Sequence, residues 1–461
     1  MESRFGNALL LPLTVFTFVH LINSEDFLHL PRLNPVSIGH EQTMHLESGR
    51  TLTIKTLAVN PPIFEIEDYL TNIECDHIIA LAMASSKWTE STIKGKVDKD
   101  KEIRKFNFTQ GDKNNDNLLD HLELWYVMPR LQNSLITIKS IPEFVQLYNY
   151  DVDGDEKLTN EEFDRIDINV AFQWIENKMK KDKKNVIRLS KQVWLNHDSD
   201  EVLRSLKTRV VSLTRLPKGV VDTSEQLQVA QYDVGGHYHG HFDTSKLDKR
   251  KCLHSRELDG IKLTEPYDAV KYRLCRYATL MYYLNDVDEG GETAFPVADN
   301  ATVSEKVIRA GGNIGDLSNH CTDANLVVKP KKGKAVLWYN HLHNKDGWVG
   351  DKDPFSYHGG CDIVKGVKWI ANHWITVDTD KQRHIRLMNL REKRYRGVER
   401  AKQEYNQKQE EQAMKQKETQ PQQQEQRKKQ HQNLRKHHNN QHLPQSELIG
   451  LEDKSYIRNE L

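Results

Sequence analysis

Short stretches of alternating polar and apolar residues recur across residues 194–377, and they constrain the fold more than any other feature of the sequence. Turns rich in Gly, Asp and Asn separate these stretches. The clearest predicted strands are residues 227–232, 277–284, 335–339 and 369–376. Because many short strands with no intervening helices are typical of layered β folds, this region predicts a β-sandwich or a jelly-roll barrel.

The residues before this region add a strand and a helix. Residues 51–59 alternate in the manner of a strand, whereas residues 71–84 carry apolar side chains at helical spacing. Thr71 and Glu74 form a capping-box pattern at the start of that helix. We therefore expect residues 25–97 to supply N-terminal strands and a helix to the β-rich domain that continues over residues 186–380.

Size and charge set further limits. A chain of 461 residues is long enough for two globular units plus tails. Its 66 Lys and Arg residues balance its 66 Asp and Glu residues, so no net charge favours nucleic acid or an acidic membrane surface. Residues 381–461 are rich in Gln, Lys and Glu and poor in apolar side chains, which predicts a disordered tail or a solvated helix.

Both ends of the chain resemble sorting signals. An apolar run over residues 8–22 is too short for a typical membrane span, so residues 1–24 are interpreted as a cleaved signal peptide, with a retained signal-anchor as the alternative. The final residues, Arg458, Asn459, Glu460 and Leu461, share the basic first residue and the Glu-Leu end of the KDEL signal. We expect an endoplasmic reticulum lumen protein, or a type II protein of that membrane if the anchor is retained.

Two further features fit an oxidising lumen. Asn107 and Asn300 begin N-x-T sequons, which predict a glycoprotein if the chain is translocated. Five cysteines allow one or two disulfides of unknown pairing and leave at least one thiol.

Residues 98–185 interrupt the strand pattern and predict an inserted α-helical module. Within it, residues 112–123 have the register of an EF-hand calcium loop. Asn117 stands where Gly is usual, but Asn tolerates the left-handed backbone expected there. The candidate calcium ligands of this loop are Asp112, Asn114, Asp116, the Leu118 carbonyl, Asp120 and Glu123.

A second loop, residues 151–162, repeats the register, which makes a calcium-binding pair more probable than a chance acidic turn. Glu156 occupies its sixth position at a conformational cost, so we expect weaker binding there. Its candidate ligands are Asp151, Asp153, Asp155, the Lys157 carbonyl, Thr159 and Glu162.

The sequence HFD places His241 and Asp243 two residues apart, so both face the same side if the segment is a strand. An H-x-D tripeptide is weak evidence alone, and His237, His239 and His241 could belong to a polar loop. A distal His358 completes two imidazoles and one carboxylate, the donor set of the facial triad of non-haem iron(II) oxygenases.

Lys368 follows His358 by ten residues. A lysine that points into a barrel is costly unless it is paired with an anion. In a facial-triad oxygenase, the distal carboxylate of 2-oxoglutarate is the expected partner.

Four long motifs resemble the prolyl 4-hydroxylases: LQVAQYDVGGHYHGHFD, RYATLMYYLNDVDEGGETAFPVADN, VKPKKGKAVLWYN and FSYHGGCDIVKGVKWIANHWI. The resemblance covers roughly residues 60–378 and includes the EF-hand insertion that distinguishes one subgroup. It implies an α+β protein whose catalytic core is a double-stranded β-helix, or jelly roll, with supporting helices and an inserted EF-hand pair. It also implies hydroxylation of a peptidyl proline at C4 in a protein or peptide substrate.

The resemblance further implies specific residue roles. His241, Asp243 and His358 would ligate Fe(II), and Lys368 would bind 2-oxoglutarate. Tyr232 would lie near the cosubstrate, and Thr279 and Tyr283, four residues apart, would line the pocket. Glu292 resembles a residue near the metal entrance, although a plain turn carboxylate is an equal alternative, and Trp374 is expected to be a core aromatic. The implied cosubstrates are 2-oxoglutarate and O2, with ascorbate restoring iron.

Two alternatives stay open. One is a hydroxylase of another side chain, such as lysine; the Lys368 anchor is closer to the prolyl enzymes. The other is a luminal Ca2+-binding protein with an inactive oxygenase fold, which predicts a broken triad or a missing anchor.

Overall fold

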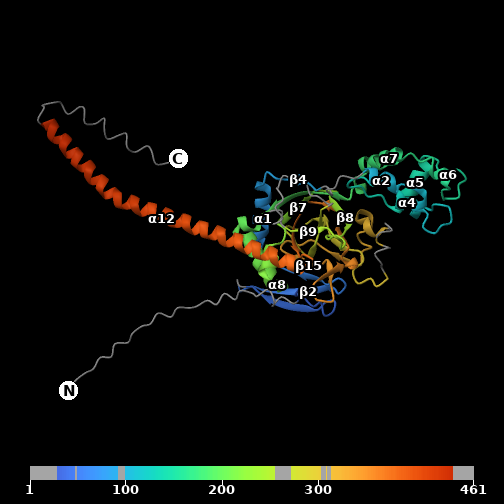
Figure 1. Ribbon diagram of the computed structural model, residues 1–461, viewed down its shortest axis with the longest axis horizontal. Helices are drawn as coiled ribbons and strands as arrows, with labels where there is room; N and C mark the ends of the chain where they lie inside the picture. The colour runs from blue at the N-terminus through green and yellow to red at the C-terminus, as the bar shows by residue number, and fades with distance from the viewer. Residues whose placement is uncertain are drawn as a thin grey trace, which may run out of the picture. The chain divides into compact units, whose positions relative to one another are not determined.

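The computed structural model describes residues 29–46, 49–91, 99–254, 271–302, 308 and 313–439 (Figure 1). The chain divides into two units, one ending at Arg391 and one beginning at Glu392. The predicted signal segment and the C-terminal tetrapeptide lie outside the described residues. Within the part that is described, no helix combines the length and the apolar character that crossing a membrane requires.

The largest element is an antiparallel sheet that has nine strands among the described residues. All four strands predicted between residues 227 and 376 lie in it, with bounds that differ by at most one residue. Across the sheet the strands are β1 Glu41–His45, β2 Thr51–Ala58, β3 Ile63–Ile66, β15 Ala335–Tyr339, β11 Arg276–Tyr283, β20 Lys368–Thr376, β7 Leu227–Tyr232, β6 Lys191–Leu195 and β4 Thr89–Glu90.

A second sheet carries the candidate site. Its five described strands are, in order, β14 Leu326–Val328, β13 Thr293–Phe295, β18 His358–Gly360, β8 His237–His241 and β5 Arg188–Leu189. Three small pairs complete the strands: β9 Lys251–Leu253 with β10 Tyr272–Leu274, β12 Glu289–Gly290 with β19 Ile363–Lys365, and β16 His341–His343 with β17 Val349–Lys352. Two antiparallel sheets of this kind agree with the predicted jelly-roll core.

Strand β11 is buried along its whole length because both faces of the large sheet are covered. Leu280 and Tyr282 pack into a core with the helices, whereas Met281 and Tyr283 pack into a core with Phe295 of the second sheet. Alternate side chains of one strand therefore build two different cores. The candidate site borders the core that lies between the sheets.

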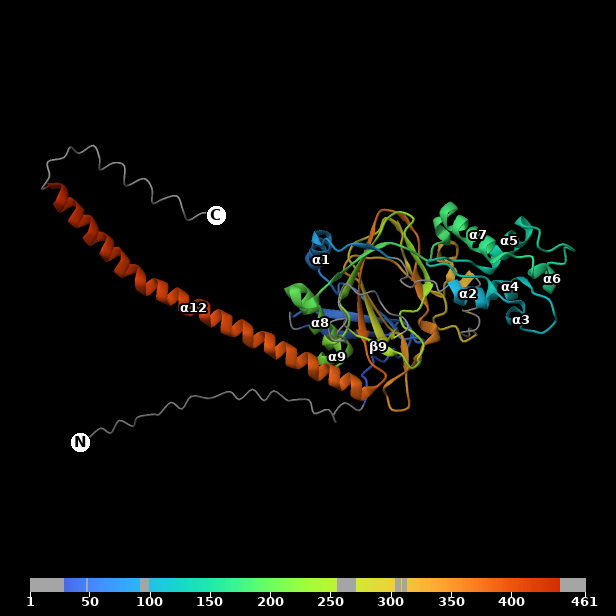
Figure 2. The same ribbon diagram turned by 45° about the horizontal axis from the view of Figure 1, so that its top comes forward.

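Three helices cover the outer face of the large sheet (Figure 2). The first, α1 Asn72–Ala84, begins with the predicted capping box, in which Thr71 and Glu74 each accept a backbone N–H from the other. The other two, α8 Glu201–Thr214 and α9 Lys218–Asp222, contradict the expectation of strands without intervening helices.

Helix α8 shows why that expectation is wrong. Its buried residues Leu203, Leu206 and Val210 recur at helical spacing, and the Asp200 side chain caps its first turn. The valines and threonines of this segment have modest helix propensity, so burial against the sheet, rather than local preference, stabilises the helix.

Helices also occupy residues 99–181, where the inserted module is expected (Figure 1). They are α2 Lys99–Lys105, α3 Phe108–Gly111, α4 His121–Val127, α5 Ile141–Leu147, α6 Asn160–Phe163 and α7 Ile168–Lys181. Their own apolar core contains Trp125, Phe144, Phe163 and Trp174. This segment is thus stabilised by burial that is separate from the cores of the sheets.

Two disulfides are present, Cys252–Cys275 and Cys321–Cys361, and the Cys75 thiol is buried. The second disulfide connects the region of the short helix α11 Leu317–His320 to the segment that follows β18. The sequence did not determine which cysteines form disulfides. The Cys321–Cys361 disulfide links two segments that lie next to the candidate site.

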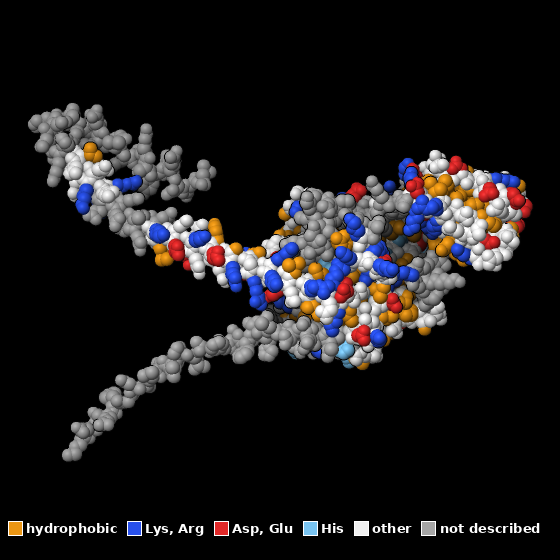
Figure 3. Space-filling model, viewed as in Figure 1, with side chains coloured by type: hydrophobic (Ala, Val, Ile, Leu, Met, Phe, Trp, Pro, Cys, Tyr) orange, Lys and Arg blue, Asp and Glu red, His pale blue; other side chains and the backbone are white. Residues whose placement is uncertain are grey.

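A long helix, α12 Lys381–Asn439, occupies the region predicted to be disordered or a solvated helix. His384 and Ile385 in its first turns are buried. Its described side chains beyond these turns are mostly polar or charged and exposed (Figure 3). The solvated helix is therefore the correct alternative for this part of the tail.

Candidate active site

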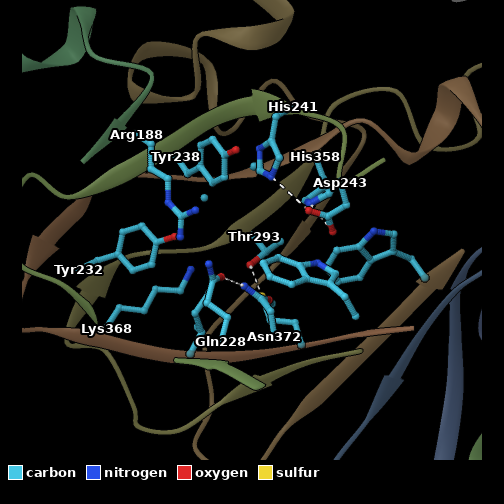
Figure 4. Close-up of a pocket in the computed structure, with 16 residues that line it drawn as sticks. Arg188, Gln228, Tyr232, Tyr238, His241, Asp243, Thr293, His358, Lys368 and Asn372 are labelled. Atoms are coloured by element: carbon cyan, nitrogen blue, oxygen red, sulfur yellow. Dashed lines mark hydrogen bonds and ion pairs between the residues drawn. The ribbon is translucent and has the colours of Figure 1, made fainter. Parts of the chain in front are cut away.

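Strands β8 and β18 bring the two predicted metal-binding histidines together. His241 and His358 are direct partners across this antiparallel pair, and their ring centres are 4.5 Å apart. Asp243 follows β8 and lies with its carboxylate between them: Oδ1 is 3.6 Å from His241 Nε2, and Oδ2 is 3.6 Å from His358 Nε2 (Figure 4). One ligand atom from each residue lies within 4.8 Å of the other two, so the three can share one ion.

The backbone fixes how both imidazoles present their nitrogens. His241 Nδ1 is 2.9 Å from the His239 carbonyl oxygen, and His358 Nδ1 is 2.8 Å from the Ser356 carbonyl oxygen. A carbonyl oxygen only accepts, so Nδ1 carries the proton and Nε2 keeps its lone pair. Burial lowers the pKa of His358 to about 4 against the opposing effect of Asp243, which keeps this lone pair free at neutral pH.

A chain of hydrogen bonds holds Asp243 from behind. Thr279 donates to Asp243 Oδ2 at 2.7 Å, Asn340 donates to Thr279 at 2.8 Å, and Trp338 donates to Asn340 at 3.0 Å. All four side chains are buried. The chain therefore fixes the orientation of the carboxylate before any ion binds.

The ionisation of Asp243 is also fixed by its surroundings. Burial opposes its negative charge, but the imidazoles of His358 and His241 and the guanidinium of Arg276 outweigh burial and lower the pKa. Arg276 is itself held by Glu225 at 2.7 Å and reaches within 3.9 Å of Asp243. Asp243 is thus a carboxylate, as a metal ligand requires.

Lys368 lies at the far side of the same cavity (Figure 4). It begins β20, pairs with Tyr232 at the end of β7, and is only 3% exposed. Its ammonium nitrogen is 5.7 Å from the Tyr232 ring and 5.5 Å from the Tyr283 ring, and it makes no ion pair with a carboxylate among the described residues. Burial lowers the pKa of Lys368 to about 7 against the smaller effect of Glu292.

Tyr232 lines the cavity as predicted, but two other predicted residues do not. Thr279 lies behind Asp243 with its hydroxyl engaged there. The Tyr283 hydroxyl is 2.7 Å from Thr293 Oγ1, so Thr293 faces the cavity where Tyr283 was expected. Thr279 and Tyr283 do share one side of β11 with Met281, and of these three residues Met281 is the one that lines the cavity.

Glu292 and Trp374 have surroundings that the sequence did not specify. Glu292 lies next to Cys321 and Cys361, and because these cysteines form a disulfide, this trio is not a metal site. It acts on the cavity through its charge, which raises the pKa of Lys368 against burial. Trp374 is buried as predicted, yet it also lines the cavity.

Sequence reasoning missed Arg188 and the structural roles of two histidines. Arg188 of β5 lines the cavity, and the apolar neighbours Val186, Ile187 and Leu189 were the available signal for a strand there. His237 and His239 are buried on β8 with Nε2 atoms 2.7 Å and 2.8 Å from the carbonyl oxygens of Val186 and Lys184. They belong to a strand and not to a polar loop.

The two acidic loops make matching hydrogen bonds. Glu123 accepts from the N–H groups of Lys113 and Asp120, and Glu162 accepts from those of Val152 and Thr159. The loops also pair with each other, since Leu119 and Leu158 exchange backbone hydrogen bonds of 2.8 Å and 2.9 Å.

Three predicted ligands of the second loop lie close together. The carboxylates of Asp151, Asp153 and Asp155 lie within 4.8 Å of one another. In the first loop, Asn114 replaces one carboxylate, and Asp112 accepts from the N–H groups of Asp116 and Asn117. Asn117 and Glu156, the sixth residues, both adopt the expected left-handed backbone, with φ of 64° and 66°.

Comparisons with known proteins identify the family of the segment that carries this site. A family model described as the 2OG-Fe(II) oxygenase superfamily matches residues 227–376, which include all three proposed ligands and Lys368. That description supports iron(II) and 2-oxoglutarate as the cofactors.

Among curated proteins, the transmembrane prolyl 4-hydroxylase of Homo sapiens is 37% identical over 367 residues, covering 77% of this chain and 71% of the human protein. Prolyl 4-hydroxylase 2 of Arabidopsis thaliana is 32% identical over 195 residues, covering 42% of this chain and 54% of the plant protein. Among solved structures, a viral collagen prolyl hydroxylase from Paramecium bursaria Chlorella virus-1 matches with a TM-score of 0.30 and 18% identity, covering 68% of this chain and 94% of that chain. The chain belongs to the prolyl 4-hydroxylase family of 2OG-Fe(II) oxygenases.

Proposed function

We propose that this chain hydroxylates a prolyl residue at C4 in a protein or peptide substrate, with Fe(II), 2-oxoglutarate and O2, and with ascorbate as the reductant that maintains iron. One observation carries the proposal: three ligand atoms converge within 4.8 Å beside a cavity whose other side holds a buried ammonium. Bound iron would supply oxygen activation coupled to decarboxylation of 2-oxoglutarate to succinate.

The residues present fit that metal. His241, Asp243 and His358 offer two neutral imidazole nitrogens and one carboxylate, a donor set that suits iron(II) and leaves positions for other ligands. The Nδ1 hydrogen bonds of both histidines aim their Nε2 lone pairs toward the carboxylate. Thr279 keeps that carboxylate in place and is a positioning residue.

Lys368 would bind the C5 carboxylate of 2-oxoglutarate. A buried ammonium without an anion is unstable, and a carboxylate brought in by the cosubstrate would restore its charge. Tyr232 lies beside it and shapes the same end of the cavity. Trp374 and Ile370 line the cavity with apolar surface and exclude water from it.

We also propose that the helical module is an EF-hand pair that binds two Ca2+ ions. The matching hydrogen bonds, the bridge between Leu119 and Leu158 and the left-handed sixth residues support this proposal. The ligand oxygens would be those of the residues predicted from the loop register.

The proposed compartment is the lumen of the endoplasmic reticulum. Two disulfides among the described residues fit an oxidising environment. The sequons at Asn107 and Asn300 fit the same assignment, and attachment to the membrane by the N-terminal segment is the alternative.

The first prediction tests catalysis itself. Purified protein incubated with proline-containing peptides, Fe(II), ascorbate and 2-oxoglutarate should form succinate, and mass spectrometry should locate the added oxygen on proline. His241→Ala removes one proposed ligand and should abolish succinate formation. Oxygen found on lysine would favour the alternative hydroxylase, and the absence of succinate from the unaltered protein would favour the inactive calcium-binding protein.

The second prediction concerns the support of Asp243. Thr279→Val keeps the shape of the side chain but removes the hydrogen bond to the carboxylate, so metal affinity should fall about 10-fold to 100-fold. Binding of Mn(II) by calorimetry would measure this change. Thr214→Val is the matched control, because Thr214 is equally buried and bonds a carbonyl oxygen within α8. Equal affinity in both variants would exclude the positioning role.

The third prediction is a pH dependence of 2-oxoglutarate affinity. Lys368 has a pKa of about 7 in the empty cavity, and a bound carboxylate must raise that pKa. Binding is therefore strongest below pH 7 and weakens by up to about tenfold per unit as pH rises through the interval between the two pKa values. Lys368→Arg keeps its proton throughout and should flatten the profile, whereas Lys368→Ala should weaken binding at every pH.

Fluorescence of the cavity residues Trp338 and Trp374 can report this binding from about pH 6 to pH 9. A profile that stays flat in the unaltered protein, or that keeps its slope in Lys368→Arg, would contradict the assignment of Lys368.

The fourth prediction concerns calcium. Calorimetry should find two ions per chain, and Glu123→Gln and Glu162→Gln should each leave one, because each removes a bidentate ligand. The second loop should bind several-fold more weakly, since the left-handed Glu156 is strained more than Asn117. Unchanged stoichiometry in both variants would reject the EF-hand assignment.

A further inference from the structure

The cavity contains a second cation that neither the iron site nor the cosubstrate accounts for. Arg188 lies on β5, directly opposite Tyr238 of β8. Its guanidinium carbon is 4.6 Å from the centre of the Tyr238 ring, and its Nε donates to Ser190 Oγ at 3.1 Å. Figure 4 shows the guanidinium between Tyr232 and Tyr238, directed into the cavity.

The backbone of Arg188 is fixed from both sides by one residue of the helical module. Asn133 accepts the Arg188 N–H at 2.9 Å through its side-chain oxygen and donates to the Arg188 carbonyl at 3.0 Å. Its own carbonyl accepts the N–H of Ile187. Together with the Tyr238 ring, these bonds preorganise the guanidinium, so little conformational entropy is lost when it binds an anion.

Arg188 has no carboxylate partner among the described residues, whereas two other partly buried arginines, Arg209 and Arg276, do. Arg209 pairs with Glu74, and Arg276 pairs with Glu225. The distal nitrogens of Arg188 can therefore donate hydrogen bonds to an anion from outside the chain. A guanidinium binds a carboxylate with two parallel hydrogen bonds, which makes it selective for that group.

The charges in the cavity indicate where such an anion would come from. Iron(II), Asp243, protonated Lys368 and the dianion of 2-oxoglutarate together carry no net charge. Arg188 then adds one positive charge that no described residue of the cavity offsets. With the cosubstrate carboxylate assigned to Lys368, the remaining source of a carboxylate is the substrate.

We propose that Arg188 binds a carboxylate side chain of the substrate close to the target proline, so that acidic peptides are preferred. This inference rests on the proposed function and names its substrate class. The Tyr238 ring lies 4.6 Å from the guanidinium and 3.5 Å from the His241 ring. Because an extended chain rises about 3.3 Å per residue, the acidic residue lies within about three positions of the proline.

Binding of labelled peptides tests this inference without requiring turnover. The probes are heptapeptides with one central proline and one Asp placed in turn at each of the other positions, each with an Asn twin. Their affinities are measured by fluorescence anisotropy for the full chain loaded with Mn(II) and 2-oxoglutarate. At one or more positions, the Asp peptide should bind at least tenfold more tightly than its twin.

In Arg188→Gln, each Asp peptide and its Asn twin should bind with about equal affinity. Arg188→Lys should retain only part of the preference, because an ammonium lacks the two parallel N–H donors of the planar guanidinium. Lys183→Gln is the matched control, since it removes one exposed positive charge from the same segment and should keep the full preference. A preference at no position, or one that survives in Arg188→Gln, overturns the inference. A larger loss of 2-oxoglutarate affinity than of peptide affinity in Arg188→Gln also overturns it, because Arg188 would then bind the cosubstrate.

Succinate formation by the unaltered protein is measured on the same preparation. It distinguishes a failure of this inference from a failure of the proposed function. Succinate without an Arg188-dependent preference rejects the inference alone. Absence of succinate rejects the proposed function, while the binding data still decide whether Arg188 selects acidic peptides.

Discussion

The pairing register of β8 and β18 is the constraint on which the site depends. His241 and His358 meet only because they are direct partners across this antiparallel pair. A slip of one residue would turn His358 to the opposite face of the sheet and leave the metal site without its third ligand. Glycines permit the close approach: a Cβ at Gly359 would lie 2.4 Å from the Tyr238 carbonyl oxygen, and one at Gly240 would lie 2.4 Å from the Tyr357 hydroxyl. The sequence HYHGH followed by HGG is thus a packing requirement as much as a ligand pattern.

Burial on both faces of the large sheet sets the electrostatics of the site. Because β11 and β20 are covered by helices on one face and by the second sheet on the other, Lys368 and Asp243 lie in a region with little water. Burial therefore acts against both charges. Asp243 remains ionised because His241, His358 and Arg276 surround it, whereas the pKa of Lys368 falls because no described carboxylate is close enough to compensate. One environment thus produces a preformed carboxylate and an ammonium that needs a partner.

Local pattern predicted the strands and the capping box, because each rests on spacing within a short segment, whereas the roles of His241, Asp243, His358 and Lys368 were implied by resemblance of long motifs to a family. It failed where distant segments decide the outcome. Helix α8 is stabilised by a sheet formed from remote strands. Thr279 was placed in the pocket because spacing along β11 gives the side that faces the second sheet but not which residue of that side reaches the cavity. Arg188 was missed for the same reason, since its neighbours Asn133 and Tyr238 are about fifty residues away in either direction.

The position of Arg188 connects the helical module to the cavity by backbone continuity. Helix α7 ends at Lys181, and the next residues place the carbonyl groups of Lys184 and Val186 on His239 and His237 of β8. Asn133, between the two acidic loops, holds the same segment from its other side. The strand that carries a cavity cation is therefore stabilised jointly by the module and by the strand that carries His241. A disturbance of the Asn133 contact would move Arg188 and β5 before it reached the metal ligands, because His241 is held independently by its pairing with His358.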